Sequence, residues 1–152
     1  MSTYTATVRW HRTGDGDFTK GQYGRAHEWT FDGGVTVPAS ASPHVVPAPW
    51  SDPQGIDPEE AFIASLSSCH MLFFIDYARR DGWIIDTYHD DAQGRMEKRA
   101  DGKIAVTKVT LRPKIEWAGA EPTADQVAQL HHRSHEDCFI ANSVNCEVTI
   151  EQ

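Results

Sequence analysis

Three cysteines, Cys69, Cys138 and Cys146, are the side chains of this sequence best suited to do chemistry. Taken singly, a free cysteine in a core helix, at a helix end or in a strand most often packs as a small apolar residue. An odd number of cysteines in 152 residues also argues against a disulfide framework. If these residues act, they act as thiols, and Cys146, in an alternating strand pattern, is the weakest candidate.

Histidines near two of the cysteines raise the possibility of a metal site. His131 and His135 are one helical turn apart, Cys138 follows three residues later, and His70 adjoins Cys69. A mixed His/Cys zinc site can be drawn from these residues, but no CxxC or HExxH spacing supports it. The glycine-rich segments match neither a phosphate loop nor a dinucleotide fingerprint, and no G-x-S-x-G motif occurs. We therefore predict no metal and no cofactor.

The charge balance excludes some classes of partner. Lysine and arginine total 14 against 22 acidic residues, which gives a net charge of −8. Such a field does not attract nucleic acid or an anionic membrane surface, and we expect neither as a partner. The uncharged apolar run of residues 61–75 is shorter than the roughly 20 residues that cross a bilayer, so it predicts a core helix. The N-terminal residues lack an export signal, which predicts a cytoplasmic protein.

A strong helix start precedes the first cysteine. Asp57 is suited to be the N-cap, Pro58 the first helical residue, and Glu60 the partner of a capping box, while Glu59 lies at the positive end of the helix dipole. The helix should run to Arg80 and stop at Gly82. Because its middle is apolar or small on every side, it must be covered nearly all round, and a second subunit is the expected source of that cover.

Strands and a second helix account for the rest of the chain. Residues 38–55 hold five prolines and predict a surface connector. Asp101-Gly102 predicts a hairpin, and Thr123 is the expected cap of a helix running towards residues 135–136. Extended segments are predicted at residues 4–10, 28–37, 83–96, 104–115 and 146–151. This order predicts a single α+β domain over residues 1–152, with sheet packed on helix.

Three segments taken together carry a family resemblance. They are Asp57-Pro58-Glu59-Glu60, the run Ala64-Ser65-Leu66-Ser67-Ser68-Cys69-His70, and Cys138-Phe139-Ile140-Ala141-Asn142-Ser143-Val144. The first cysteine follows Glu59 by ten residues, and the second comes 69 residues later. This combination resembles the OsmC/Ohr family of osmotically induced and organic-hydroperoxide-resistance proteins. The resemblance implies an OsmC-like fold, in which a long central helix is wrapped by antiparallel sheet, and an intertwined homodimer.

The resemblance also implies roles for individual residues. Cys69 corresponds to the thiol that attacks a peroxide, Cys138 to the resolving thiol, and Glu59 to the helix-start glutamate of the site. Arg25 is the preferred candidate for the arginine that assists the thiol. Two other arginines, Arg9 and Arg12, remain alternatives. The residues after each cysteine, His70 and Phe139-Ile140, differ from those of the best-known organic-peroxide enzymes and indicate an outlying OsmC-like branch.

Helix geometry limits how Glu59 can act. Ten residues of helix separate Glu59 from Cys69 by about 15 Å along the axis. Either Glu59 reaches the site from the partner subunit, or it only complements the helix dipole. The first alternative predicts a site at the dimer interface, with Arg25 and Glu59 supplied across it.

The implied activity is reduction of organic hydroperoxides to alcohols through a Cys69 sulfenic acid and a Cys69–Cys138 disulfide, reopened by an external dithiol. Apolar side chains around Cys69 suit a lipophilic substrate, although an ordinary core would contain them too. The candidate substrate-binding residues are Phe62, Leu66, Phe73 and Trp50. The alternative function is a non-enzymatic small-molecule or stress-response binding protein on the same scaffold.

Overall fold

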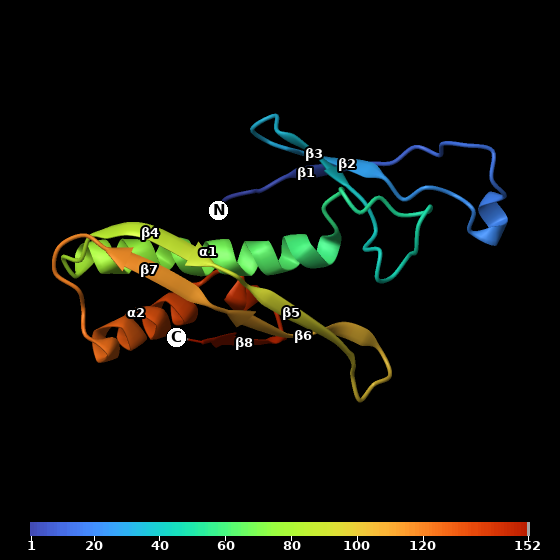
Figure 1. Ribbon diagram of the computed structural model, residues 1–152. Coiled ribbons are helices and arrows are strands. Elements are labelled where there is room, and N and C mark those ends of the chain that lie inside the picture. Colours follow the sequence, from blue (N-terminus) through green and yellow to red (C-terminus); the bar gives the residue numbers. More distant parts are fainter. Residues whose placement is uncertain (152) are drawn as a thin grey trace. The chain divides into compact units, whose positions relative to one another are not determined.

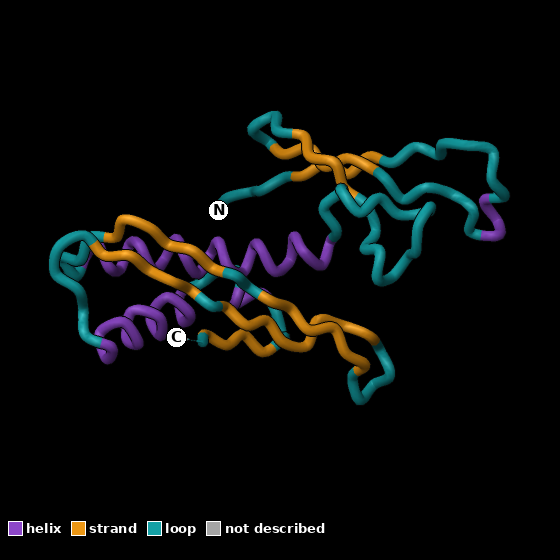
Figure 2. Tube along the Cα trace, in the orientation of Figure 1, coloured by secondary structure: helices purple, strands orange, loops and turns teal. Residues whose placement is uncertain are grey.

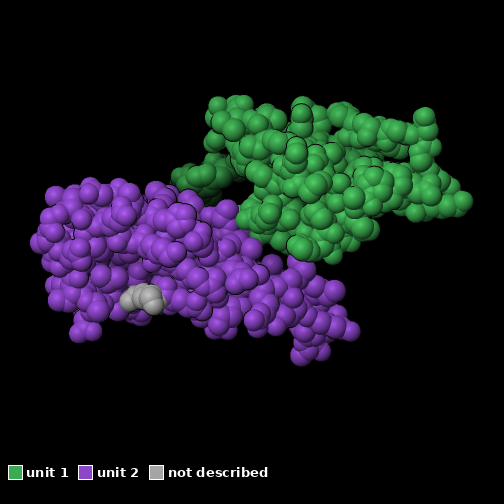
Figure 3. Space-filling view, in the orientation of Figure 1, with its two compact units in different colours: residues 1–61 green, residues 62–152 purple. Residues whose placement is uncertain are grey.

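The structure is a computed structural model that describes residues 1–151. It is an α+β fold with two α-helices and three small sheets (Figures 1 and 2). The chain divides into two compact units, Met1–Ala61 and the part from Phe62 onward (Figure 3). Because the long helix α1 (Pro58–Arg80) runs through this boundary, the division leaves the prediction of a single domain untested.

The first unit is built on a three-stranded antiparallel sheet. Its strands are β1 (Ala6–Arg9), β2 (His27–Phe31) and β3 (Thr36–Ala39), paired in the order β1-β2-β3. A short 3-10 helix, η1 (Phe18–Lys20), lies in the loop between β1 and β2. Gly34 allows the tight turn before β3 because it adopts a φ of +83°. The predicted strand at residues 4–10 is confirmed as β1, whereas the segment predicted at 28–37 divides into β2 and β3, which pair antiparallel across the turn at Gly34. Strand β3 also takes in residues 38–39 of the predicted connector.

Helix α1 begins with the predicted capping box. The Glu60 backbone N–H donates to the Asp57 carboxylate at 2.7 Å, and the Asp57 N–H donates to the Glu60 carboxylate at 3.1 Å. The helix ends at Arg80, followed by Gly82 with a φ of +86°. Both ends of the helix are therefore formed by the residues that the sequence indicated, the capping box at its start and Gly82 after its end.

One stripe of α1 is buried, not its whole surface. The buried residues are Leu66, His70, Phe74 and Ala78, which recur every four residues. On the face away from this stripe, Leu72 is 61% exposed and Ile75 is 38% exposed. One chain therefore does not supply the all-round cover that we predicted. By length and composition alone α1 also qualifies as a membrane-spanning helix, as core helices often do.

The second unit departs from the predicted strands at two places. Residues 83–96 form two strands, β4 (Ile85–Asp90) and β5 (Gln93–Lys98), in different sheets. Residues 104–115 likewise divide into β6 (Ile104–Leu111) and β7 (Pro113–Trp117). The Asp90 side chain accepts a hydrogen bond from the Arg112 N–H at 2.6 Å, which ties the two breaks together. The chain thereby passes from one sheet to another.

The C-terminal strand also corrects the expectation of an antiparallel sheet. After helix α2 (Ala124–Asp137) and a 3-10 turn η2 (Ala141–Ser143), strand β8 (Glu147–Ile150) pairs parallel with β6. The other pairings, β5 with β6 and β4 with β7, are antiparallel. The Thr123 cap of α2 is confirmed and is part of a second capping box, with Gln126.

Two apolar clusters hold α1 against the rest of the second unit. Leu66 packs with Val109 and Leu111 of β6, and Phe74 and Ala78 pack with Leu130 of α2. Leu66 is 1% exposed, and we expect Leu66→Ala to destabilise the protein by roughly 2–5 kcal/mol through lost contacts and a residual cavity. Urea unfolding of the two proteins measures this difference. A change below about 1 kcal/mol would contradict the assigned packing.

Candidate active site

Two cysteine side chains distant in sequence meet between the two helices. Cys69 lies in the middle of α1, and Cys138 is the C-cap residue of α2. Their side chains lie close enough for Cys69 to influence the pKa of Cys138, and both are free thiols. Cys138 is 1% exposed, whereas Cys69 is partly accessible. The structure thus brings together Cys69 and Cys138, the two cysteines that correspond to the family's thiol pair. Of the two, Cys69 is the one that a solute can reach.

The environment of Cys138 keeps its proton in place. Burial, followed by the hydrogen bond to Cys69, raises the pKa of Cys138 to about 11. At neutral pH Cys138 is therefore a protonated thiol. The two cysteines are chemically unequal, since Cys138 is buried and Cys69 is partly exposed.

The turn after Cys138 is fixed by its own hydrogen bonds. The Ala141 N–H donates to Cys138 Sγ at 3.4 Å, and the Asn142 N–H donates to the Cys138 carbonyl at 3.0 Å. The Asn142 side chain also donates to the Glu136 carbonyl at 2.8 Å. These bonds fix the backbone and the sulfur of Cys138 at the end of α2. The third cysteine, Cys146, packs at the edge of the Leu66 cluster and is not part of the Cys69–Cys138 pair.

An aromatic pair lies beside the thiols. Phe73 is one turn after Cys69, and its ring contacts that of Phe139 edge-on, with centroids 5.0 Å apart. Phe139 follows Cys138 directly and is 71% exposed. The sequence indicated Phe73 as a substrate contact but missed Phe139, whose signal was a large apolar side chain within a polar turn. Leu66 is a correction, because it is buried in the core, where substrate has no access.

Two buried histidines join the same helices. His70 Nε2 and His131 Nδ1 are hydrogen-bonded at 2.9 Å, and the two side chains are 1% and 3% exposed. Burial and then the charge of His135 lower the pKa of His70 to about 4, and burial and then His70 lower that of His131 to about 3. Both are therefore neutral near pH 7. Among residues 1–151, no cluster of three or more histidine, cysteine or acidic side chains is arranged to hold a metal.

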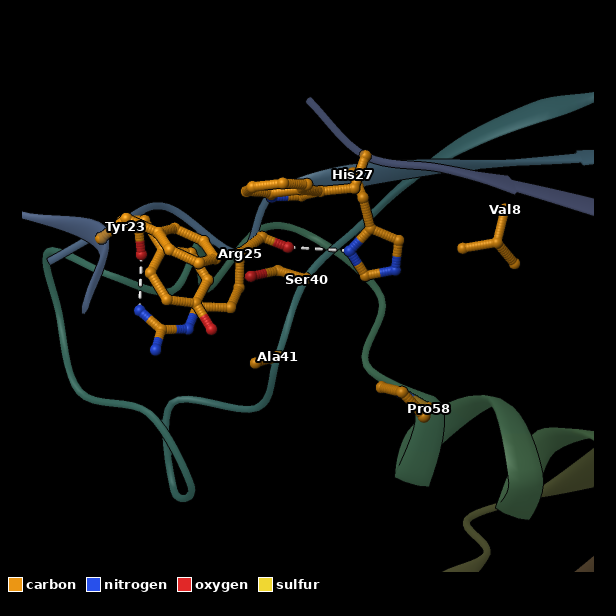
Figure 4. A pocket seen from close by; sticks show the side chains of 9 residues that line it. Val8, Tyr23, Arg25, His27, Ser40, Ala41 and Pro58 are labelled. Carbon is orange, nitrogen blue, oxygen red and sulfur yellow. Dashed lines mark hydrogen bonds between the residues drawn. The ribbon is translucent and has the colours of Figure 1, made fainter. Parts of the chain in front are cut away.

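Arg25 lies in the first unit, at an apolar cavity of about 460 Å³ (Figure 4). Its guanidinium stacks on the Tyr23 ring at 3.7 Å, and Nη1 donates to the Gly21 and Tyr23 carbonyls at 2.9 and 2.5 Å. Trp10 and Phe18 add aromatic walls that the sequence analysis missed. Of the three candidate arginines, only Arg25 lines this cavity.

Three other predicted site residues lie outside the thiol pair, Trp50 and Glu59 in the first unit and Phe62 at the start of the second. Trp50 does not line the cavity, although its carbonyl accepts a hydrogen bond from the Arg25 N–H at 2.9 Å. Phe62 is partly buried against the Leu66 cluster. Glu59 is in the first turn of α1, and in the described part of the chain no ion pair joins it to Arg25. A meeting of Arg25, Glu59 and the thiols across two subunits stays a prediction.

An α+β fold that places two reduced cysteines close together on neighbouring helices defines a protein with a dithiol site. The family model described as OsmC-like protein matches residues 51–152, and the chain belongs to this family. The predicted resemblance is thereby confirmed. No curated protein matches the chain.

Solved structures agree with this family. An OsmC-like protein of unknown function from Vibrio cholerae O1 biovar eltor is 51% identical, with a TM-score of 0.96 and coverage of 99% of each chain. The organic hydroperoxide resistance protein OhrB of Bacillus subtilis is 23% identical, with a TM-score of 0.71 and coverage of 99% of this chain and 97% of that one. An organic hydroperoxide resistance protein from Elizabethkingia anophelis is 18% identical (TM-score 0.71, coverage 100% and 97%). The last two likenesses establish the fold.

Proposed function

We propose that this protein reduces organic hydroperoxides to alcohols, with Cys69 as the attacking thiol and Cys138 as the resolving thiol. The observation that carries the proposal is the pair of neighbouring free thiols, one buried and one partly exposed, contributed by α1 and the end of α2. Membership of the OsmC-like family and the fold shared with two organic hydroperoxide resistance proteins support it.

In the first step the Cys69 thiolate attacks the O–O bond of the hydroperoxide. The sulfur loses two electrons and becomes a sulfenic acid, while the other oxygen leaves with a proton as the alcohol. Only the thiolate form of Cys69 is nucleophilic, whereas Cys138 stays protonated because its pKa is raised to about 11. The partial exposure of Cys69 gives the peroxide access.

In the second step Cys138 attacks the sulfenic sulfur, a disulfide forms and water leaves. The two side chains are already close enough to influence each other, so closure needs no large movement of the turn at residues 138–143. An external dithiol then reopens the bridge by exchange and returns both thiols. Such a reductant fits a cytoplasmic location, which we propose for this protein.

Arg25 and Glu59 complete the proposed site from a partner subunit. A guanidinium stabilises a thiolate and can orient the peroxide oxygen, and Arg25 has no carboxylate partner within the described residues of its own chain. Glu59 lies too far along α1 to reach Cys69 of the same helix. In the proposed dimer its carboxylate would hold the arginine fork.

The exposed face of α1 supports the homodimer. Its exposed residues, Ser65, Ser68, Leu72 and Ile75, follow the alternating three- and four-residue spacing at which two helices pack along a seam. We expect Leu72→Glu, which places a charge in this seam, to convert a dimer into a monomer in sedimentation experiments and to lower peroxidase activity. Wild-type protein that is monomeric at micromolar concentration would contradict the shared site.

We expect the protein to prefer an organic hydroperoxide to hydrogen peroxide. An apolar surface at Phe73 and Phe139 stabilises a cumyl or alkyl group and makes no such contact with hydrogen peroxide. We expect kcat/KM for cumene hydroperoxide to exceed that for hydrogen peroxide by at least about tenfold. Phe139→Ala should reduce this preference, while Phe31→Ala, at another exposed phenylalanine, should leave it unchanged. Equal turnover of cumene hydroperoxide and hydrogen peroxide would count against a lipophilic site.

The function itself is tested by following hydroperoxide consumption with the purified, reduced protein and dithiothreitol. Catalytic loss of cumene hydroperoxide, far above the rate with dithiothreitol alone, is the expected result. The apolar cavity at Arg25 favours a second candidate, non-enzymatic binding of an apolar small molecule. That function would leave the hydroperoxide unconsumed and would survive replacement of both cysteines.

A further inference from the structure

A buried polar contact links the two helices close to both thiols. His70 is the residue after Cys69 on α1, and His131 lies two turns before Cys138 on α2. Their ring nitrogens are 2.9 Å apart, and the ring planes are within 9° of parallel. The Phe74 ring lies 4.3 Å from the His131 ring, between centroids, and Leu130 is also buried nearby. The hydrogen bond is therefore set in a largely apolar helix interface.

Such a contact is more specific than the apolar packing around it. Phe74, Ala78 and Leu130 can slide by a fraction of a turn and still remain buried, because apolar packing has no preferred direction. A buried imidazole that loses its partner leaves an unsatisfied polar group. His70 Nδ1 is already buried without a partner, so the bond at Nε2 is the one hydrogen bond of this side chain within residues 1–151. The pair therefore favours a single placement of α2 against α1.

We propose that His70 and His131 are positioning residues that hold the resolving thiol Cys138 against Cys69. The inference rests on the proposed function for its catalytic consequence. Neither histidine is required for the attack on the peroxide, which needs only Cys69. Both are required for fast closure of the disulfide, because closure depends on how often the two sulfurs are in contact.

The test measures the first and second steps separately in matched variants. His131→Leu removes the hydrogen bond, whereas His131→Asn keeps a polar atom near the position of Nδ1. Reduced protein is mixed with one equivalent of cumene hydroperoxide, and quenched samples are analysed for sulfenic acid, trapped with dimedone, and for the Cys69–Cys138 bridge. We expect His131→Leu to slow bridge formation by about tenfold or more while Cys69 oxidation stays within about threefold of wild type. His131→Asn should restore closure.

A second measurement separates this inference from the peroxidase proposal. The equilibrium constant for exchange of the Cys69–Cys138 disulfide with dithiothreitol reports how well the fold holds the two sulfurs together, with no peroxide present. This equilibrium constant, written for formation of the protein disulfide, should be at least about tenfold smaller in His131→Leu than in wild type. His132→Leu, at the exposed neighbouring histidine, is the matched control and should match wild type.

Each outcome decides one of the two proposals. Wild-type protein that does not react with the hydroperoxide rejects the peroxidase function, and the exchange constant still tests the positioning. A folded His131→Leu variant with wild-type closure and exchange overturns the positioning role. If His131→Leu does not fold, the pair His70→Gln and His70→Met repeats the comparison from the other helix. Equal exchange constants in that pair would also overturn it.

Discussion

Cys69→Ser should abolish hydroperoxide reduction, lowering kcat/KM by about a thousandfold or more. A serine hydroxyl stays protonated at neutral pH and is a poor nucleophile towards a peroxide, so the first step has no replacement. Cys138 cannot substitute, because it is buried and burial raises its pKa to about 11. The measurement is consumption of cumene hydroperoxide with dithiothreitol as reductant.

Cys138→Ser should separate the two steps. The variant keeps its first turnover and accumulates a Cys69 sulfenic acid, but it turns over more slowly and loses activity by further oxidation of Cys69. Cys146→Ser is the matched control, because Cys146 is outside the thiol pair and should be replaceable without loss of turnover. Substantial activity of Cys69→Ser would place the chemistry on another residue.

The second large effect is on acid stability. The pKa of His70 is lowered to about 4 and that of His131 to about 3, with burial as the main cause. An unfolded chain has histidines with a pKa near 6.5, so between that value and about 4 it binds more protons than the folded protein. The contribution of the two neutral histidines to the free energy of unfolding is therefore fully present above pH 6.5. It falls as the pH drops towards 4, by up to about 1.4 kcal/mol per pH unit for each histidine.

Urea unfolding at pH 7, 6 and 5 measures this loss against variants. The double variant His70→Gln/His131→Asn cannot take up these protons, and it should lose less stability than wild type over the same range. His132→Gln, at an exposed histidine, should follow the wild-type curve. If the double variant and wild type lose stability in parallel below pH 6.5, the histidine pair is not the origin of the acid lability.

The elements nearest the site were predictable because local chemistry fixes them. Asp57, Pro58 and Glu60 mark the start of α1, and Thr123 marks that of α2, since side-chain caps act within a single turn. The meeting of Cys69 with Cys138 followed from the family resemblance. No spacing rule brings residues on two different helices together.

Other features depend on long-range packing that the sequence does not display. The β-branched residues within 104–115 indicate strand, but the transfer to another sheet at Arg112 depends on a hydrogen bond that the Arg112 N–H donates to the distant Asp90. The parallel pairing of β8 with β6 is equally non-local. His70 next to Cys69 suggested a possible metal ligand, and its bond to His131 became visible only with both helices in place.

The account is tested most directly by thiol mapping after one equivalent of an organic hydroperoxide. Mass spectrometry of the wild-type protein should find one intramolecular Cys69–Cys138 bridge per chain, with Cys146 still a free thiol. A Cys69 that stays reduced, or that is oxidised while Cys138 remains unbridged, would contradict a site built from these two sulfurs.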